Sequence, residues 1–465
     1  MRRSWFVLLL VCSAQFMVTL DVTVANVALP SIGRDLGFAV GDLQWVITPY
    51  VLLTGGFMLL GGRAADLLGR RAVFLGGLAV FTLASLASGL AGSPAVLVGA
   101  RALQGVGAAL LLPAALSILT TTYEGAQRTR ALAAWGAIGS SGMAVGLLVG
   151  GLLTELVGWR GIFLINVPIG LAVLVVGAQT LGRGVAGRPS LRGLDGRGAL
   201  LLVSGLVVAL YAISEAQDEG WGSLVTLGGL AVAAALLAGF AASERAARNP
   251  LVPATLWRRR SLVSGTVVTA GATAIMVGAF FLNTLYLQDV LGMTALETGL
   301  AFLPVAIAVL AAAHVGSHLI GHLGSRAVLL IGLVAVGGAG PGLAFVPDHA
   351  SYLADLLWAY VLLGFGAGLS FVGVSVGAMA DVEHAEAGGA SGLVTTGHEV
   401  GAALGVALLS AVATAGVTPG DLGALAAGYR SGFVVVVGLT VALVGVAAAL
   451  MPTVRPPAGA RMALH

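Results

Sequence analysis

Two charged side chains lie inside long apolar stretches of this sequence, and their types suit the movement of a proton. Asp21 stands in the first apolar stretch and Arg101 in a later one. A carboxylate in hydrocarbon costs roughly 2.5–3.5 kcal/mol on insertion scales, so Asp21 is expected to face protein or a water-filled cavity. A nearby arginine keeps a carboxylate ionised, and separating the two in a desolvated place favours its protonation. The pair therefore predicts a proton switch, with a fixed ion pair that joins two helices as the alternative.

The depths of these two charges along their helices allow them to meet. At the rise of an α-helix, Asp21 lies roughly 12 Å below the outer end of its helix and Arg101 about 9 Å below the same surface. The two helices run in opposite directions, yet the charges reach similar depths, so each would lower the cost of burying the other. Gln104 follows one turn after Arg101 on the same face, where we expect it to bind substrate or steer water.

A second membrane acid, Glu399, is the other candidate for a proton or cation site. A stripe of small residues that begins at Gly397 lies on nearly the opposite face of the same predicted helix, and Thr395 lies one turn before Glu399. A glycine face favours helix packing, which leaves the polar face for a cavity. Glu399 also stands only about six residues inside the predicted span, measured with the usual span length. Pairing with His398 at the inner interface is therefore the alternative.

Three histidines, His314, His318 and His322, recur every four residues and therefore share one face of a predicted helix. That spacing could bind a metal or relay protons. No cysteine or acidic residue is adjacent in the sequence, so an interfacial polar face is the favoured interpretation. No metal site and no cofactor are predicted.

The elements that must position these groups are membrane helices. Of the 465 residues, 58% are hydrophobic and 9% are charged, against roughly 25% charged in a soluble domain. A spanning helix needs about 20 mostly apolar residues, and this measure predicts an all-α polytopic membrane protein with fourteen spans. They lie at approximately 5–29, 44–62, 73–91, 95–119, 131–153, 162–181, 198–214, 223–242, 262–286, 296–320, 327–346, 352–379, 393–416 and 431–451.

The arginines predict the orientation of these spans. Basic loops stay on the cytoplasmic side, and with both termini inside only Arg34, Arg160 and Arg430 fall in outer loops. We therefore expect a multi-pass protein of the inner (plasma) membrane with cytoplasmic N- and C-termini. A basic linker at 183–189 and a second basic segment at 244–260 divide the spans into six, two and six. The expected domains are 1–182, a six-helix bundle; 183–260, a linker with two additional helices; and 261–465, a second six-helix bundle with a short tail.

A short basic turn at 62–71 joins two of the spans and forces them to be antiparallel neighbours. Its glycines are expected to let the helix ends approach, and its acid to pair at a buried edge with Arg70 or a helix N-terminus. The pattern G-x-x-x-D-x-x-G-R-R resembles the signature loop between helices 2 and 3 of the major facilitator superfamily. The resemblance implies a conformational switch at Gly62, Asp66, Gly69, Arg70 and Arg71.

Further segments resemble the fourteen-helix drug:proton antiporters of that superfamily, the multidrug and antibiotic efflux type. The resemblance covers nearly the whole chain and implies the major facilitator fold. It also implies that Asp21 and Arg101 take part in proton coupling, because they match the family's helix-1 and helix-4 motifs. The matching segments are Leu20–Pro30, Leu97–Gly107, Trp159–Pro168, Tyr286–Gln288, Gly299–Pro304 and Ala390–Leu393.

One glycine stripe resembles the antiporter signature of the superfamily, with one departure. Small residues at this spacing let helices pack closely, and we expect the stripe to abut a helix of the other bundle. Leu147 stands where the family has a proline, so a kink determinant is missing. Symport therefore stays open beside antiport. The stripe consists of Gly142, Gly146, Gly150 and Gly151.

Aromatic and amide residues at expected cavity positions suit bulky amphipathic ligands, although each could serve packing or interfacial anchoring instead. They are Asn26, Trp45, Tyr50, Gln104, Trp135, Asn283, Tyr286, Phe371 and Thr395. With the proton residues they predict a proton-coupled exporter of hydrophobic or amphipathic small molecules, such as antibiotics or dyes, that works by alternating access.

The alternatives within transporters are a dedicated exporter of a self-made natural product and a proton-coupled symporter. The chain shows no nucleophile–base pair, no H-E-x-x-H and no phosphate-binding loop, so it is not expected to be an enzyme. It has no repeated filter-like segment of a channel and no basic run suited to nucleic acid. The expected partners are the small-molecule substrate, protons and the lipid bilayer, and the expected state is a monomer.

Overall fold

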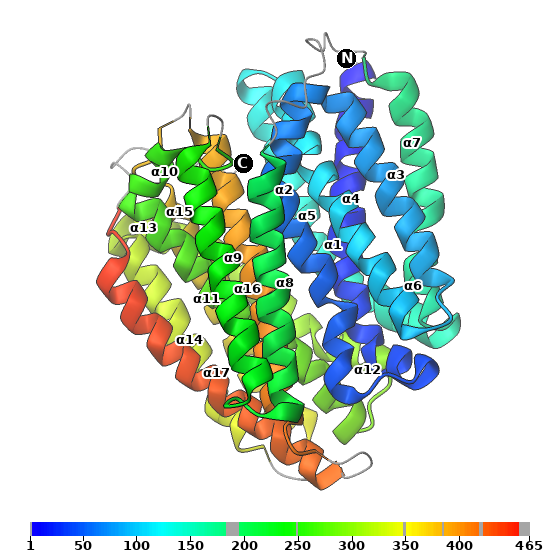
Figure 1. Ribbon diagram of the computed structural model, residues 1–465, viewed down its shortest axis with the longest axis vertical. Helices are drawn as coiled ribbons and strands as arrows, with labels where there is room; N and C mark the ends of the chain where they lie inside the picture. The colour runs from blue at the N-terminus through cyan, green and yellow to red at the C-terminus, as the bar shows by residue number, and fades with distance from the viewer. Residues whose placement is uncertain are drawn as a thin grey trace. The chain divides into compact units, whose positions relative to one another are not determined.

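The computed structural model describes residues 2–182, 195–247, 250–346, 350–383, 386–417 and 422–454 (Figure 1). Over these ranges every regular element is a helix. Fourteen helices in the described residues are long and apolar enough to cross a membrane. The predicted all-α class and the predicted fourteen spans are therefore confirmed.

The helices divide between two compact units. Unit 1 comprises residues 1–251 and 283–300, and unit 2 comprises 252–282 and 301–465. The predicted linker at 183–189 lies outside the described residues, and the three-part division of the chain stays a prediction. The helices up to the second unit are α1 (Arg2–Leu36), η1 (Val40–Val46), α2 (Thr48–Leu68), α3 (Arg70–Gly89), α4 (Pro94–Thr122), α5 (Gly125–Leu156), α6 (Arg160–Leu164), α7 (Asn166–Thr180), α8 (Gly196–Glu219) and α9 (Leu224–Ala246).

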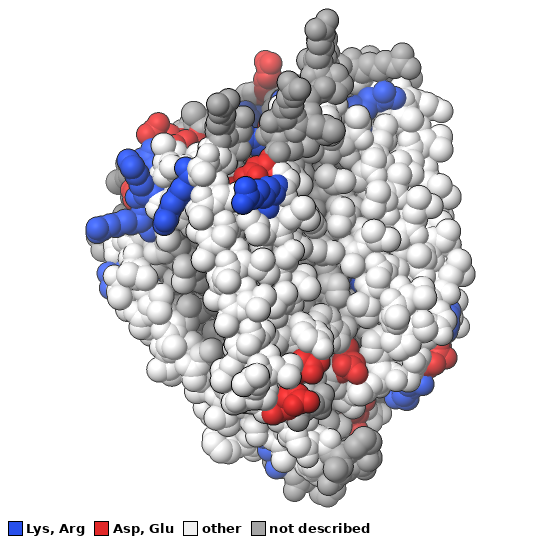
Figure 2. Space-filling model, viewed as in Figure 1, with Lys and Arg blue, Asp and Glu red and all other residues white. Residues whose placement is uncertain are grey.

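The remaining helices belong to unit 2, except for the segment 283–300, which clusters with unit 1. They are α10 (Ala254–Arg258), α11 (Arg260–Leu285), η3 (Tyr286–Val290), α12 (Ala295–Ala301), α13 (Leu303–Leu323), α14 (Ser325–Ala344), η4 (Tyr352–Leu356), α15 (Leu357–Ala378), α16 (Ala387–Thr414) and α17 (Leu422–Leu450). Figure 2 shows several arginines close together at the place that α10 takes in Figure 1.

In unit 1, α4 is packed closely by both α2 and α3 because glycines remove the side chains between the backbones. A Cβ on Gly107 of α4 would lie 2.6 Å from the Phe81 nitrogen of α3, and a Cβ on Gly105 would contact the backbone of Tyr50 in α2. Gly61 of α2 faces the backbone of Ala109 in the same way. Small residues at helix interfaces allow this approach in membranes. They fix the position of α4, which carries Arg101.

The glycine stripe of α5 packs mainly on α1. Gly142 faces Thr19, and Gly146 faces Thr23. Gly150 contacts Val24, one turn further along α1, whereas Gly151 contacts Ala295 and Leu296 of α12. The prediction that the stripe abuts the other bundle is therefore wrong for its first three glycines. Repeating small residues define a packing face but do not identify the partner, and α1 offers short or β-branched side chains at the matching spacing.

In unit 2, α16 packs on α11 through a second glycine stripe. Gly397 and Gly401 face Thr266 and Ala270, and the stripe continues one turn on at Gly405. Helix α11 therefore meets α16 at every fourth residue along both helices. This contact fixes the face of α16 that carries His398 and Glu399.

Replacing Gly401 by Ala is expected to destabilise unit 2 by about 1–3 kcal/mol, the usual cost of overpacking. The new Cβ would lie 2.7 Å from the Cα of Ala270, so two helix backbones must separate. Gly438→Ala on α17 is the matched control, because nothing lies within 4 Å of a Cβ there. Thermal unfolding in detergent measures the difference, and equal melting temperatures for the two variants would contradict the close packing.

Candidate functional site

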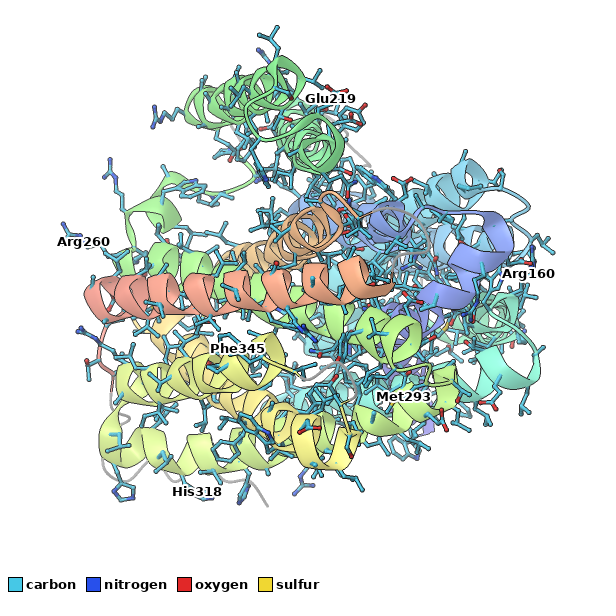
Figure 3. The ribbon with its side chains drawn as sticks, turned by 90° about the horizontal axis from the view of Figure 1, so that it is seen from below. Arg160, Glu219, Arg260, Met293, His318 and Phe345 are labelled. Atoms are coloured by element: carbon cyan, nitrogen blue, oxygen red, sulfur yellow. The ribbon has the colours of Figure 1, made fainter. Side chains whose placement is uncertain are left out.

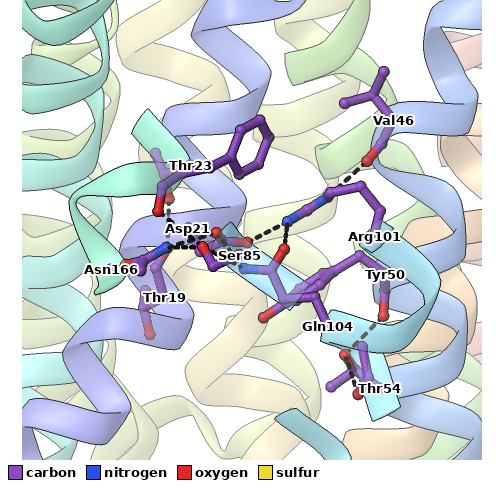
Figure 4. A network of polar contacts seen from close by, with 12 residues as sticks. Thr19, Asp21, Thr23, Val46, Tyr50, Thr54, Ser85, Arg101, Gln104 and Asn166 are labelled. Carbon is purple, nitrogen blue, oxygen red and sulfur yellow. Dashed lines mark hydrogen bonds and ion pairs between the residues drawn. The ribbon is translucent and has the colours of Figure 1, made fainter. Parts of the chain in front are cut away.

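Asp21 and Arg101 form a fully buried ion pair in unit 1. Arg101 Nη1 lies 2.5 Å from Asp21 Oδ2, and both side chains are 0% exposed (Figure 4). The contact agrees with the depths predicted from the sequence. A buried charge is stable only when a partner and hydrogen bonds replace its hydration, so each of these residues depends on the other. Their role in proton coupling stays a prediction.

The guanidinium of Arg101 is held on several sides. Its Nε donates to the carbonyl of Val46 at 2.9 Å, and its Nη1 also donates to Gln104 Oε1 at 2.7 Å. The ring of Tyr50 lies 4.2 Å from the guanidinium carbon and that of Phe163 lies 5.4 Å away. These rings give cation–π stabilisation that a desolvated cation gains most from. The predicted role for Gln104 is thus joined by a structural one, the orientation of Arg101.

The second oxygen of Asp21 is bound by two amides. Gln104 Nε2 donates to Oδ1 at 2.7 Å, and Asn166 Nδ2 donates to the same atom at 2.9 Å. Both amides also donate to Ser85 Oγ, at 3.3 Å and 3.0 Å. Ser85 in turn donates to the carbonyl of Phe163 at 2.9 Å. The carboxylate therefore accepts from three side chains, an arrangement that stabilises its ionised form.

Four helices bring these groups together, as Figure 4 shows: α1 carries Asp21, α3 carries Ser85, α4 carries Arg101 and Gln104, and α7 begins at Asn166. Ser85 and Asn166 are the two members that sequence reasoning missed. Asn166 is a polar residue in an apolar span and could have been found by that signal. Ser85 could not, because many Ser and Thr hydroxyls in helices bond only to their own backbone, as Thr82 does to Leu78.

A second ionic contact ties the end of α1 to α6. Asp35 Oδ2 accepts from Arg160 Nη1 at 2.5 Å and from the indole nitrogen of Trp159 at 3.0 Å. Arg160 also donates to the carbonyl of Ala91, and Figure 3 shows it at the edge of the bundle. The side chains of Asp35 and Arg160 are 47% and 41% exposed, so the pair contributes little stability. It links three segments of unit 1 at one end.

The structure corrects the predicted position of Glu399. Helix α16 begins at Ala387 rather than near 393, so Glu399 lies about 18 Å along it. It is half-buried, and it lies near the middle of the helix that forms this candidate span. The predicted alternative of pairing with His398 is not supported, because His398 Nδ1 contacts Thr273 Oγ1 at 3.0 Å. A proton role for Glu399 stays a prediction.

The turn between α2 and α3 is present but differs from the prediction in detail. Gly69 has a φ of 95°, so it both ends α2 and begins α3 in a conformation that favours glycine. Asp66 is exposed rather than at a buried edge, and it joins no ion pair with Arg70 in the described part of the chain. Arg71 instead donates to the carbonyl of Ala178 at 2.7 Å. Close approach of the helices depends on Gly61, since Gly62 has only an ordinary contact with a proline of α4.

The predicted cavity residues fall in both units, and a cavity that they share stays a prediction. Tyr50, Gln104 and Asn26 are buried inside unit 1, and Trp135 is half-buried there. Phe371 in unit 2 is 60% exposed. Thr395 donates to the carbonyl of its own helix, and Asn283 and Tyr286 are buried in the segment 283–300 of unit 1. An apolar cavity of about 220 Å³ in unit 1 includes only one of the set, and it is lined by Trp45, Thr48, Pro49, Leu52, Leu53, Val98, Ala102 and Val207.

The three histidines share an exposed face of α13. The rings of His314 and His318 lie 4.8 Å apart, and both side chains and that of His322 are exposed. Figure 3 shows His318 at the periphery of the structure. The described residues contain no group of three or more His, Cys, Asp or Glu side chains placed to hold a metal.

Comparisons with known proteins agree with this architecture. The family model of the Major Facilitator Superfamily matches residues 11–406. The cephamycin export protein CmcT of Amycolatopsis lactamdurans is 41% identical over 453 residues, which cover 95% of this chain and 90% of that protein. The puromycin resistance protein pur8 of Streptomyces alboniger is 39% identical, with 89% and 82% covered. An auto-inhibited POT-family peptide transporter shares the fold at a TM-score of 0.69, with 17% identity and 99% of both chains covered.

Proposed function

The chain belongs to the Major Facilitator Superfamily, and on that premise we propose that it exports hydrophobic or amphipathic small molecules in exchange for protons. The observation that carries the proton part is the buried pair of Asp21 and Arg101. An ionisable acid in a membrane span is a functional site by default, because its burial is costly. The relatives named for cephamycin export and puromycin resistance support the class of substrate.

The proposed cycle uses alternating access between two helical bundles. Asp21 takes up a proton while the protein faces outward and parts from Arg101. It releases the proton inward as substrate binds, and the ion pair forms again. Glu399, half-buried near the middle of its span, is proposed as a second proton or cation site. The protein is proposed to work as a monomer in the plasma membrane with both termini in the cytoplasm, the side that the basic loops favour.

A dedicated exporter of one natural product is the second candidate function. It is favoured by the relative named for cephamycin, since that protein is named for a single compound. Symport stays open because α5 runs without a proline through Leu147, so the kink that the antiporter signature provides is missing.

Expression in an efflux-deficient host tests the export proposal. Cells carrying the chain are expected to accumulate several-fold less puromycin, cephamycin or dye than cells with an empty vector. A protonophore should abolish the difference, because the proton gradient is the proposed driving force. Greater accumulation in expressing cells would show uptake and contradict export, and protection limited to one compound of the panel would favour the dedicated exporter.

A further inference from the structure

The carboxylate of Asp21 is surrounded by hydrogen-bond donors. Arg101 Nη1 donates to Oδ2, while Gln104 Nε2 and Asn166 Nδ2 both donate to Oδ1. This arrangement fits the ionised acid. None of the three groups, oriented as they are, can accept the proton that a neutral Asp21 would carry. The contact with at least one of them therefore changes when Asp21 is protonated.

The two amides differ in how firmly their oxygens are held. Gln104 Oε1 accepts from Arg101 at 2.7 Å, so its amide cannot turn without breaking that bond. Asn166 Oδ1 is buried and has no hydrogen-bond partner among the described residues. The reversed orientation of Asn166 is excluded while Asp21 is ionised, because its oxygen would then face the carboxylate. Asn166 is thus the amide whose oxygen can accept a hydrogen bond when Asp21 is protonated, without losing a bond that it makes now.

The helices that carry the donors also distinguish Asn166. Arg101 and Gln104 both lie on α4, one turn apart, so any displacement of α4 from α1 removes both from Asp21. Asn166 belongs to α7, so its contact with Oδ1 does not depend on the position of α4. The carboxyl group that has parted from its arginine would then have a single amide beside it.

We propose that Asn166 is a positioning residue whose side-chain amide turns over when Asp21 takes up its proton, an inference that rests on the proposed proton coupling. In the ionised state Nδ2 of Asn166 donates to Oδ1 of Asp21. When a proton from water binds that oxygen, the O–H of Asp21 donates to Oδ1 of Asn166 instead. The amide forms and breaks no covalent bond, and its return favours release of the proton as Arg101 comes back.

Few charged or titratable side chains lie near Asp21 and Asn166. Arg101 on α4 is the charged side chain that contacts Asp21, and Tyr50 on α2 lies over Arg101. Helix α5 presents glycines to α1, and α3 and α7 contribute neutral side chains. The ion pair of Asp35 and Arg160 is about 21 Å further along α1. A pH-dependent change in the NMR signal of Asn166 would therefore report the protonation of Asp21.

The chain has four asparagines, Asn26, Asn166, Asn249 and Asn283, so labelling tests the proposal directly. Protein made by cell-free synthesis with ¹³C in the asparagine side-chain carbonyl, or in the aspartate carboxyl, is placed in lipid nanodiscs. Carbon NMR is then recorded across a pH series. The Asn166 signal, identified by its absence in Asn166→Leu, is expected to shift with the same midpoint as the Asp21 signal. It should stay constant in Asp21→Asn.

The outcomes separate this inference from the proposed function. An Asn166 signal that stays constant while Asp21 titrates overturns the turning amide and leaves proton coupling intact. An Asp21 signal that does not titrate overturns both. In transport assays Asn166→Leu is expected to slow substrate-driven proton release about tenfold, the usual weight of a hydrogen bond to a charged group. Thr82→Val, a matched buried control whose hydroxyl donates to the carbonyl of Leu78 in its own helix, should leave both the rate and its pH profile unchanged.

Discussion

Replacing Asp21 by Asn is expected to abolish substrate-driven proton release in inverted vesicles, a loss of at least about a hundredfold, since a positioned proton-transfer group contributes roughly that much or more. The amide has the size of the acid but cannot take up and release a proton. Export that depends on the proton gradient should fail with it, while substrate binding to the purified protein persists. A pH-sensitive dye enclosed in the vesicles measures the release when substrate is added.

The control for this variant is the second membrane acid. Glu399→Gln makes the same chemical change on α16 in unit 2. If Glu399 is a second site, the number of protons released per substrate falls but release does not vanish. Full proton release by Asp21→Asn would remove Asp21 from the mechanism, and loss of release in Glu399→Gln alone would assign the coupling to Glu399.

The meeting of Asp21 and Arg101 could be predicted because membrane burial makes a lone charge costly. Two opposite charges at similar depth in neighbouring spans have few other ways to lower that cost. Helical periodicity added Gln104, which lies one turn from Arg101 and bonds both members of the pair. The number of spans followed in the same way from length and hydropathy, since the bilayer sets the length of each helix.

Partners that depend on tertiary packing could not be predicted. Asn166 stands out in the sequence as a polar residue in an apolar span, but its contact with Asp21 arises because α7 begins beside α1, and no local pattern encodes that contact. The prediction that the α5 glycines pack on the other bundle was wrong for the same reason, because sequence spacing does not identify the helix that a glycine face contacts. The predicted start of the helix that carries Glu399 was wrong because hydropathy places a helix end where apolar residues begin, whereas α16 starts earlier, at Ala387. Its first turns are rich in glycine and polar residues, which hide a helix from a hydropathy measure.

Replacing Arg101 by Gln is expected to destabilise unit 1 by about 3–5 kcal/mol, the cost of leaving one buried charge without its partner. The carboxylate of Asp21 would keep the two amides but lose its only cationic contact in the described chain. Denaturant or thermal unfolding in detergent measures the loss of stability, with Arg260→Gln outside the pair as a control for the loss of one arginine.

The double variant Asp21→Asn, Arg101→Gln separates stability from coupling. Removing both charges of a buried pair is often nearly neutral, because both desolvation costs disappear together. The double variant should therefore recover most of the stability that Arg101→Gln loses, and yet release no protons when substrate is added. A double variant as unstable as the single one would show that hydrogen bonds of Arg101 to Val46 and Gln104, and not its charge, hold the site together. Recovery of stability without recovery of proton release would show that the helices do not need the ion pair in order to pack. The role of the pair would then be proton coupling, since a neutral pair would hold the helices equally well.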